Sequence, residues 1–387
     1  MHGKFLLLAL VVAGSLALRL DAQLPNFGDI AKQGLKAEAE AGDAEAQFQY
    51  GLQLIFNSPE DKKSAAQGAA WVQKAAKQDH LKAMHVLGAL YADGVGIGQD
   101  DKLAVQWQQK AADKDMPEAQ TALGLHYAQG KGVAKDLVKG LEWIKKAADQ
   151  NYLEAQALYA GSLVRGDGVP KNASKAAVWF LRAAQQETVT NERQLGYRAH
   201  AQRQLAYLYY TGNGVPVDYE RCEGWYRRSL IGTQDPMAYN DLAWFLSTCP
   251  DDKYHKGPEA VQLARKAIKL IEDNTGEQRH EVIDTMAAAL ARCGQFTEAL
   301  VWQKRCLTLL KEDKAIEEED RKKLDTEFSE RVKLYTEKKP YADKAVKPEK
   351  TGEPLLNDRV LEDARQPAPR QQVPPQRAPE KKKDTVT

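Results

Sequence analysis

The residues of this chain that could bind a metal ion or act as nucleophiles include four cysteines and seven histidines. Zinc sites usually take their ligands in close pairs, such as Cys-x-x-Cys or His-x-x-x-His, and neither spacing occurs here. The Gly-x-Ser-x-Gly elbow of hydrolases and the Walker phosphate loop are also missing from the sequence. We therefore predict a non-enzymatic protein without catalytic residues, a metal site or a cofactor.

The cysteines are better explained by packing, with one open question. Cys222 takes a position that other repeats fill with Ala or Gly, and Cys306 aligns with Ala267, so both are predicted to be small buried groups. Cys249 and Cys293 share one register at the ends of successive helices. A disulfide needs Cα atoms within about 7 Å, whereas stacked helices lie about 8–10 Å apart. A disulfide and two free thiols both remain open at this point.

The elements that carry these residues are repeats. Trp71, Trp107, Trp143 and Trp179 are each 36 residues apart, and Trp225 follows after 46. The first four open the sequence Trp-x-x-Lys/Arg-Ala-Ala, which we predict to be core rather than a base-stacking platform. A fixed period of this length indicates an array of stacked repeats. The ten extra residues before the fifth repeat, around 185–197, are expected to lengthen a helix or a loop.

Each repeat is predicted to be a helical hairpin with defined ends. The first helix opens on a small residue and ends at a glycine suited to the left-handed conformation; these glycines are Gly94, Gly130, Gly166 and Gly212. A second glycine lies two residues later, so the loop Gly94–Gly98 resembles a nucleotide loop only superficially: it follows a helix rather than a strand. The second helix is then capped by Asp100, Asp136, Asn172 or Asp218. It should stop at Gly42, Asp79, Asp115 or Asn151.

The ends of the chain differ from the repeats. Residues 1–22 read as a cleaved signal peptide, with an uncleaved anchor as the alternative, and no later segment is apolar enough to cross a membrane. We expect an N-terminal capping helix in 23–43, five repeats in 44–235, two further hairpins in 236–311 and a C-terminal capping helix in 312–339. Residues 340–387 hold eight of the 16 prolines and a lysine run, so we predict a disordered Pro/Lys-rich tail.

Residues 44–235 resemble Sel-one-like repeats, which are relatives of the tetratricopeptide repeat. The resemblance rests on Ala119-x-x-x-Leu123-Gly124-x-x-Tyr127-x-x-Gly130-x-Gly132-Val133-x-x-Asp136 and Trp143-x-x-Lys146-Ala147-Ala148. Residues 238–338 look like the tetratricopeptide-type end of bacterial repeat proteins, through Leu242-Ala243-Trp244 and Leu334-Tyr335 to Lys339-Pro340-Tyr341. The resemblance implies an all-α, right-handed helical-hairpin solenoid with a scaffold or adaptor role. One exported branch, described as binding penicillin, has paired cysteines in each repeat, which this chain lacks.

The resemblance also implies that the first helices line a concave groove. Residues two, six, nine and ten positions after each opening small residue should project there. We therefore name a candidate partner-binding groove of His85, Asp93, Gln129, Arg165, Arg203, Tyr207 and Tyr210. Tyr and Arg dominate the binding energy of many interfaces. The alternative is that the tyrosines pack between repeats four and five, under the insertion.

These features predict a periplasmic or extracellular bacterial scaffold that holds a protein or peptide partner. The net charge of +1, from 55 basic and 54 acidic residues, gives no reason to expect a nucleic-acid partner. The tail could make a weak contact with the envelope. An alternative is an envelope- or peptidoglycan-associated regulator of a cell-wall enzyme, and a less favoured one is a hydrolase or β-lactam-binding protein.

Overall fold

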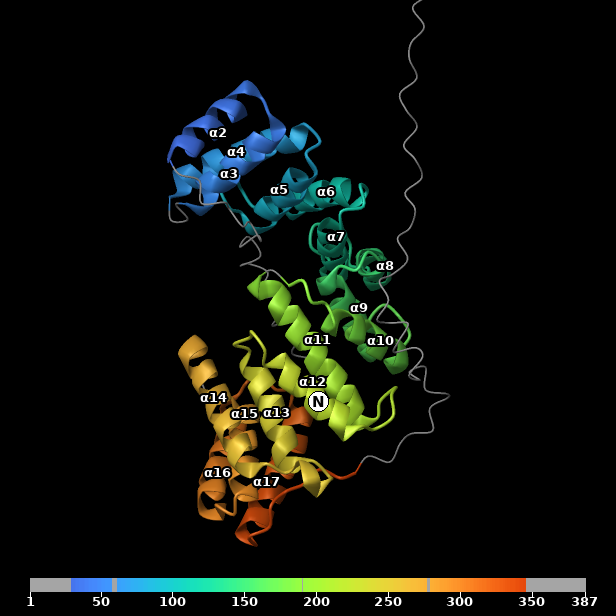
Figure 1. Ribbon diagram of the computed structural model, residues 1–387, viewed down its shortest axis with the longest axis vertical. Coiled ribbons are helices and arrows are strands. Elements are labelled where there is room, and N and C mark those ends of the chain that lie inside the picture. The colour runs from blue at the N-terminus through green and yellow to red at the C-terminus, as the bar shows by residue number, and fades with distance from the viewer. Residues whose placement is uncertain (1–28, 58–60, 190, 277–278, 346–387) are drawn as a thin grey trace, which may run out of the picture.

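The computed structural model describes residues 29–57, 61–189, 191–276 and 279–345. Within these ranges the chain is all-α, with 16 α-helices that pair into consecutive hairpins, as Figure 1 shows. The first helices of the hairpins are α3 (Ala44–Phe56), α5 (Leu81–Asp93), α7 (Pro117–Gln129), α9 (Leu153–Arg165), α11 (Glu192–Thr211), α13 (Pro236–Thr248) and α15 (His280–Arg292). The predicted helical-hairpin solenoid is thus confirmed.

The second helices and the two end helices complete the array. The second helices are α4 (Lys62–Lys77), α6 (Asp101–Ala112), α8 (Leu137–Asp149), α10 (Ala173–Ala184), α12 (Tyr219–Ser229), α14 (Gly257–Thr275) and α16 (Phe296–Glu312). Helix α2 (Asp29–Ala41) precedes the first hairpin, and α17 (Glu318–Thr336) follows the last. A 3-10 turn, Asp252–Tyr254, lies in the long loop of the sixth hairpin. The predicted signal peptide, residues 1–22, lies outside the described residues.

The first helices lie on the inner side of the curved array. They contact one another along the chain, α7 with α9, α9 with α11, α11 with α13 and α13 with α15, whereas second helices in the described chain do not contact one another to that extent. Figure 1 shows the row of hairpins as a curve whose open side lies between the first and last hairpins, with one end of α11 reaching into it. We therefore call the exposed faces of the first helices the inner surface, and those of the second helices the outer surface.

The helix ends follow the predicted chemistry. The glycines that end the first helices are left-handed, and so are the residues that end the second helices, Gly42, Asp79, Asp115 and Asn151. Asp136 accepts a hydrogen bond from the backbone N–H of Lys139, and the equivalent residues of the neighbouring repeats cap their helices in the same way. Gly132 has a φ of +72°, and a Cβ there would lie 2.1 Å from the carbonyl oxygen of Asp101. The second glycine therefore also sets the contact with the preceding repeat.

The tryptophans of the repeats are less buried than predicted. Trp71, Trp107, Trp143 and Trp179 are only partly buried. Of the five, Trp225 alone is buried, with 8% of its surface exposed. In each repeat the cation three residues later covers the ring; the Lys146 Nζ, for example, lies 3.9 Å from the Trp143 ring centroid. The rings lie at the edge of the core because the outer face of the hairpin has no further layer above it, and a cation over the ring covers what remains exposed.

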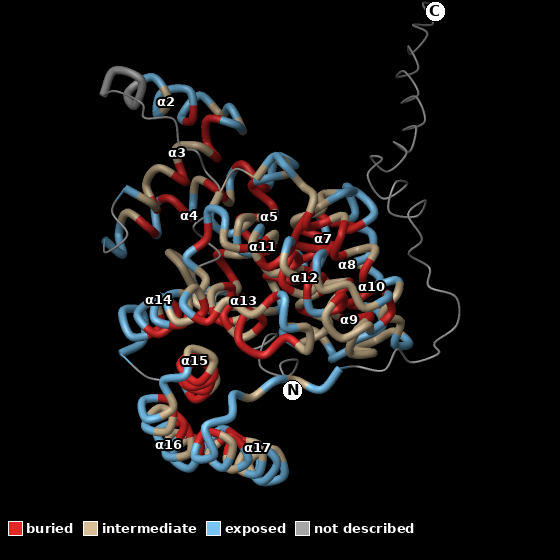
Figure 2. Tube along the Cα trace, turned by 60° about the horizontal axis from the view of Figure 1, so that its bottom comes forward, coloured by how far each residue is buried: buried red, intermediate tan, exposed pale blue. Residues whose placement is uncertain are grey.

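The repeats and the C-terminal hairpins share one core. A single cluster of buried apolar residues contains Leu205 and Leu208 of α11 together with Leu242 and Phe245 of α13. Figure 2 shows buried residues along almost the whole of α15, which is packed between α13, α14 and α16. The two blocks therefore form one continuous stack.

Two predictions about the chain segments can be compared with the structure. The extra residues before the fifth repeat form a short loop and lengthen α11 to 20 residues, against 13 in α9. At the start of the predicted tail, Tyr341 and Asp343 contact the inner surface, while Ala342, Lys344 and Ala345 are exposed. The remainder of the predicted tail, residues 346–387, lies outside the described residues.

Candidate binding surface

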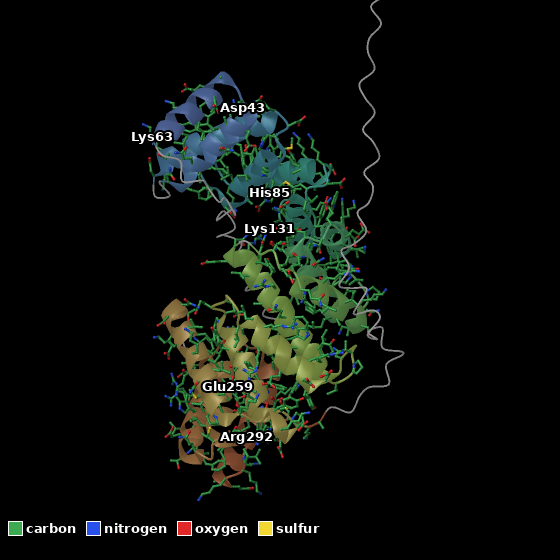
Figure 3. All side chains as sticks on the ribbon, in the orientation of Figure 1. Asp43, Lys63, His85, Lys131, Glu259 and Arg292 are labelled. Atoms are coloured by element: carbon green, nitrogen blue, oxygen red, sulfur yellow. The ribbon has the colours of Figure 1, made fainter. Side chains whose placement is uncertain are left out.

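The candidate groove residues of repeats two to four lie apart from one another. His85 is partly buried, and its Nδ1 lies 2.8 Å from Gln108 Oε1 of α6; burial lowers its pKa, which keeps the ring neutral at neutral pH. Asp93 is exposed, and its pKa is raised by partial burial although the charge of Lys131 opposes this. Figure 3 marks His85 and Lys131 in this part of the array. His85 is thus tied to its own hairpin rather than presented to a partner.

Gln129 and Arg165 end their helices without forming a shared site. Both are partly buried. The Arg165 guanidinium forms an ion pair with Asp167 in the following loop. Among the described residues, no hydrogen bond or ion pair joins either of them to His85 or Asp93, so the four positions share no polar network.

The first two turns of α11 cover the inner face of α9. Glu154 of α9 is 4% exposed, and its Oε1 accepts hydrogen bonds from Arg193 Nη2 at 2.7 Å and from the Tyr197 hydroxyl at 2.9 Å. The Tyr197 ring of α11 packs against Leu153 and Ala157 of α9. Figure 1 shows this end of α11 projecting into the opening of the curve. The insertion therefore fills part of the surface that the repeat pattern alone would leave open.

Arg203 joins the two blocks rather than lining a groove. It is 6% exposed, its Nη1 lies 2.7 Å from Asp235 Oδ2, and its Nε lies 2.8 Å from Asp241 Oδ2. Asp235 also caps α13 by accepting the backbone N–H of Met237. A buried arginine that satisfies two carboxylates is held by its surroundings. The structure therefore places Arg203 inside the junction of the two blocks, with both carboxylates as its partners, and not on the exposed inner surface.

The two tyrosines of α11 have different surroundings. Tyr207 is 43% exposed, and its pKa is raised by partial burial and by the charges of Asp343 and Asp241. Tyr210 packs edge-on against Phe245 and near Tyr219, with its hydroxyl donating to Asp343. The tyrosines therefore do not pack between repeats four and five as the alternative held. Tyr210 belongs to the junction of the two blocks, and Tyr207 stays accessible.

Residues 341–345 form an extended segment, which we call the C-terminal strap, across the inner surface. Asp343 Oδ2 accepts hydrogen bonds from Tyr210, from Trp244 Nε1 at 3.0 Å and from Thr248 Oγ1 at 3.0 Å. The Asp343 backbone N–H donates to the Thr248 carbonyl at 2.8 Å. Arg292 Nη2 donates to the Tyr341 carbonyl at 2.7 Å. Three successive inner helices, α11, α13 and α15, thus contact this short stretch of chain.

The ring of Tyr341 packs against an indole and a guanidinium that also contact each other. Its centroid lies 5.9 Å from that of Trp244 and 4.6 Å from the Arg331 guanidinium carbon. Its hydroxyl donates to Asp343 Oδ1 at 2.9 Å, and burial, followed by the charge of Asp343, raises its pKa to about 12. Arg331 is itself fixed by Asp284 of α15, at 3.0 Å. The aromatic shelf for Tyr341 therefore belongs to the rigid end of the stack.

No disulfide and no metal site occurs in the described part of the chain. All four cysteines are free thiols, which decides the open question on Cys249 and Cys293 in favour of thiols. Cys222 and Cys306 are fully buried, as predicted, and burial raises the pKa of the Cys249 thiol to about 11. In the same described ranges no three His, Cys, Asp or Glu side chains gather as they would around a metal ion. Nor does any described helix have the length and apolarity to span a membrane.

The sequence of the first block decides the family. The model of the Sel1 repeat matches five times, at residues 44–80, 81–116, 117–152, 153–187 and 199–230. The chain belongs to the Sel1-like repeat proteins. Such repeats are scaffolds that typically mediate protein interactions and are mostly non-catalytic. No curated protein matches the chain in sequence.

Two solved structures are similar to this Sel1-like protein. A Sel1 repeat protein from Oxalobacter formigenes matches with a TM-score of 0.52 and 24% identity, over 64% of this chain and 93% of that one. A protective antigen of uropathogenic Escherichia coli strains, described as having an SLR fold, matches with a TM-score of 0.45 and 24% identity, over 78% of this chain and 71% of that one. At such identity the first likeness supports the fold alone.

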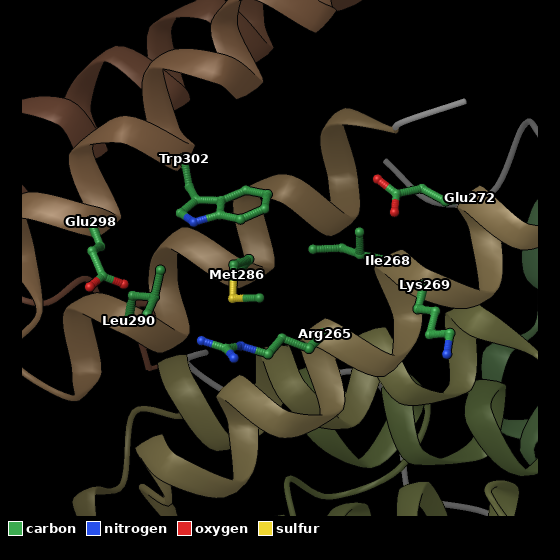
Figure 4. Close-up of a pocket in the computed structure, with 8 residues that line it drawn as sticks. All are labelled: Arg265, Ile268, Lys269, Glu272, Met286, Leu290, Glu298 and Trp302. Carbon is green, nitrogen blue, oxygen red and sulfur yellow. The ribbon is translucent and has the colours of Figure 1, made fainter. Parts of the chain in front are cut away.

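The outer surface of this Sel1-like protein has a shallow depression without reactive chemistry. Figure 4 shows its lining, in which Met286 and Leu290 of α15 form the floor between α14 and α16, with Trp302 and Arg265 beside them. The lining combines apolar and oppositely charged side chains, with no nucleophile paired to a base. It offers no reason to revise the non-catalytic interpretation.

Sequence reasoning missed the residues that hold the strap. Trp244, Thr248, Arg292 and Asp343 were not among the candidates. The run Lys339-Pro340-Tyr341 was noticed as part of the family resemblance, yet the tail was taken to begin at Pro340. Lys338 is left-handed, with a φ of 58°, and a proline two residues later cannot continue the helix, so the chain must turn away from α17 there. An aromatic residue directly after such a stop was the available signal.

Proposed function

We propose that this Sel1-like protein is an exported, non-catalytic scaffold that binds a protein partner on the inner surface around α11 and α13. The observation that carries the proposal is Tyr207, a large side chain left 43% exposed on an inner helix between two ordered groups, Arg203 and Tyr210. Tyrosines on rigid supports are common anchors of binding energy. Export is supported by the apolar segment that follows Lys4 in the sequence.

Partner capture tests the surface. The full chain and two variants, Tyr207→Ala and Val301→Ala, are crosslinked to envelope proteins of the producing cells and purified, and captured proteins are identified by mass spectrometry. Val301 is a matched control, because it is an apolar residue 66% exposed on the outer helix α16. We expect Tyr207→Ala to lose the partner and Val301→Ala to keep it.

A purified partner then gives the magnitude. Loss of an aromatic anchor should raise the dissociation constant, measured by calorimetry, by about tenfold or more. Equal affinity of the Tyr207→Ala variant and the intact chain would place the partner elsewhere and contradict the proposal.

Export is tested separately by fractionation. We expect the chain in the periplasmic or extracellular fraction, shortened at its N-terminus when examined by mass spectrometry. A full-length chain in the cytoplasm would contradict the export half of the proposal and leave the binding half intact.

A further inference from the structure

The C-terminal strap is bound as a short peptide would be bound by a separate protein. Its main chain is held at two points, by Arg292 at the Tyr341 carbonyl and by the Thr248 carbonyl at the Asp343 N–H. Its side chains enter two adjacent subsites, an aromatic shelf and a carboxylate cradle. Main-chain hydrogen bonds combined with side-chain subsites are the usual means by which proteins recognise extended peptides.

The carboxylate cradle is built by the solenoid and not by the strap. Its donors are the hydroxyl of Tyr210 and the indole N–H of Trp244, joined by the Thr248 hydroxyl, which shares its one proton between Asp343 Oδ2 at 3.0 Å and the Trp244 carbonyl at 2.9 Å. Trp244 and Thr248 lie one turn apart on α13, and Tyr210 comes from α11. Helix-borne donors that converge on one point form an anion site of fixed geometry. Burial, followed by the charge of Asp343, raises the pKa of Tyr210, so this donor keeps its proton.

The aromatic shelf is also fixed without the strap. Arg331 is 5% exposed, paired with Asp284, and its guanidinium carbon lies 5.1 Å from the Trp244 ring centroid. Arg292 Nε donates to the Ser247 carbonyl at 2.6 Å, which holds its other nitrogen in place for a ligand carbonyl. Groups that are positioned in advance lose little entropy on binding. If the strap left, the Trp244 indole N–H would lose its acceptor in a partly buried position, at a cost that a new ligand would relieve.

The strap itself is weakly embedded. Ala342, Lys344 and Ala345 are exposed, and Asp343 is only partly buried; Tyr341, also partly buried, is the one strap residue that packs against the C-terminal core cluster. It is joined to α17 through the left-handed Lys338 and Pro340, a short turn that does not depend on the strap's own contacts. Segments with few buried apolar contacts open at low free-energy cost.

We propose that the surface formed by Tyr210, Trp244, Thr248 and Arg292 is a recognition site for extended peptides in which an aromatic residue is followed two positions later by a carboxylate, and that Tyr341 and Asp343 occupy this site as an internal competitor. The proposal rests on the scaffold function and adds the chemistry of its partner. A partner segment with the Tyr-x-Asp pattern displaces the strap and takes over its hydrogen bonds.

The test supplies the strap's own sequence in trans. A fluorescent peptide of residues 338–345 is titrated into the full chain and into its Tyr341→Ala/Asp343→Ala variant, and anisotropy is measured. We expect the variant to bind the peptide at least about tenfold more tightly than the intact chain, because the competitor is gone. A peptide carrying Asp343→Asn should bind about tenfold more weakly, since a charge-assisted acceptor is lost.

A change on the receiving side completes the test. Thr248→Val, placed in the strap variant, removes one donor at nearly constant volume and should weaken peptide binding, whereas Val301→Ala on the outer surface should not. Two results would overturn the proposal. One is a strap variant that unfolds cooperatively near the wild-type temperature yet binds no peptide. The other is a strap variant without a cooperative transition, which would make the strap part of the fold.

The result of the peptide titration can be told apart from the result of the partner capture. The titration uses purified components only, so it tests the recognition site without any cellular partner. In the capture experiment the strap variant should retain more partner than the intact chain. Peptide binding without any capture would refute the scaffold function and leave the internal recognition in place.

Discussion

Helix α11 covers the inner face of α9 with its first two turns, whereas the C-terminal strap covers parts of α11, α13 and α15 with an extended chain. The first cover buries Tyr197 and satisfies the buried carboxylate of Glu154. The second cover makes hydrogen bonds and ring contacts and leaves its own residues at least partly exposed. The first turns of α11 are therefore part of the core, whereas the strap is bound at the surface as a ligand would be.

The difference follows from local sequence. The insertion before repeat five is long enough to add helical turns whose backbone groups bond to one another, so it needs only an apolar face to stay in place. The strap follows a proline and is extended, so its N–H and C=O groups need partners from elsewhere. Those partners are Thr248 and Arg292.

The largest effect is expected from Tyr197→Ala. This change removes a buried aromatic ring packed on Leu153 and Ala157 and leaves Glu154 with one donor fewer, so the free energy of unfolding should fall by about 3–5 kcal/mol. Denaturant titration followed by circular dichroism measures it. Tyr197→Phe is the control and should cost only about 1 kcal/mol. A loss below about 1 kcal/mol for the alanine would show that the first cover is as loosely held as the second.

Acid should destabilise α11 just beyond the first cover through His200, which lies against Phe180 of α10. Burial lowers its pKa to about 3, with help from Arg203 and Arg165 and against the charge of Asp235. Because the folded pKa lies below the unfolded value of about 6.5, the unfolded state binds the extra proton and stability falls as the pH drops below that value. By pH 5 the loss from this residue should be about 2 kcal/mol.

The matched variant is His200→Phe, which keeps a ring in place and removes the titration. Its stability should fall less than that of the intact chain between pH 7 and pH 5, by about the same 2 kcal/mol. Parallel pH profiles of the two proteins, measured by urea unfolding, would refute a partly buried histidine that stays neutral at this position.

The second cover should respond much more weakly in stability. Tyr341→Ala removes a half-buried ring that touches Trp244 and Arg331, and the expected cost is about 1 kcal/mol. Hydrogen exchange should report the local change, with faster exchange at the Asp343 amide and little change within α9. A loss as large as that of Tyr197→Ala would contradict the ligand-like character of the strap.

Sequence alone predicted what depends on near neighbours. The Asp136-type caps and the left-handed stops were correct because each is decided within a few residues and is repeated along the chain. The environment of Arg203 was not predictable in this way, since its partners Asp235 and Asp241 become neighbours only when the two blocks stack. The site around Tyr210 depends on Asp343, 133 residues away. Periodicity predicts which face a residue takes, and it does not say whether another segment already covers that face.

The smallest effect is expected on the outer surface, where Lys146 lies over the ring of Trp143. This is the same kind of cation–π contact that Arg331 makes with Tyr341 of the strap. Lys146→Met keeps the aliphatic stem and removes the charge, so the loss in unfolding free energy should be about 0.5 kcal/mol for an exposed cation–π pair. Lys304→Met, on the exposed face of α16, is the control and should have no measurable cost. Because Arg331 is buried and Lys146 is not, the strap's contact should be the stronger of the two. If Tyr341→Ala costs no more than Lys146→Met, the strap is held by its hydrogen bonds alone, and the carboxylate at position 343 becomes the dominant element of recognition.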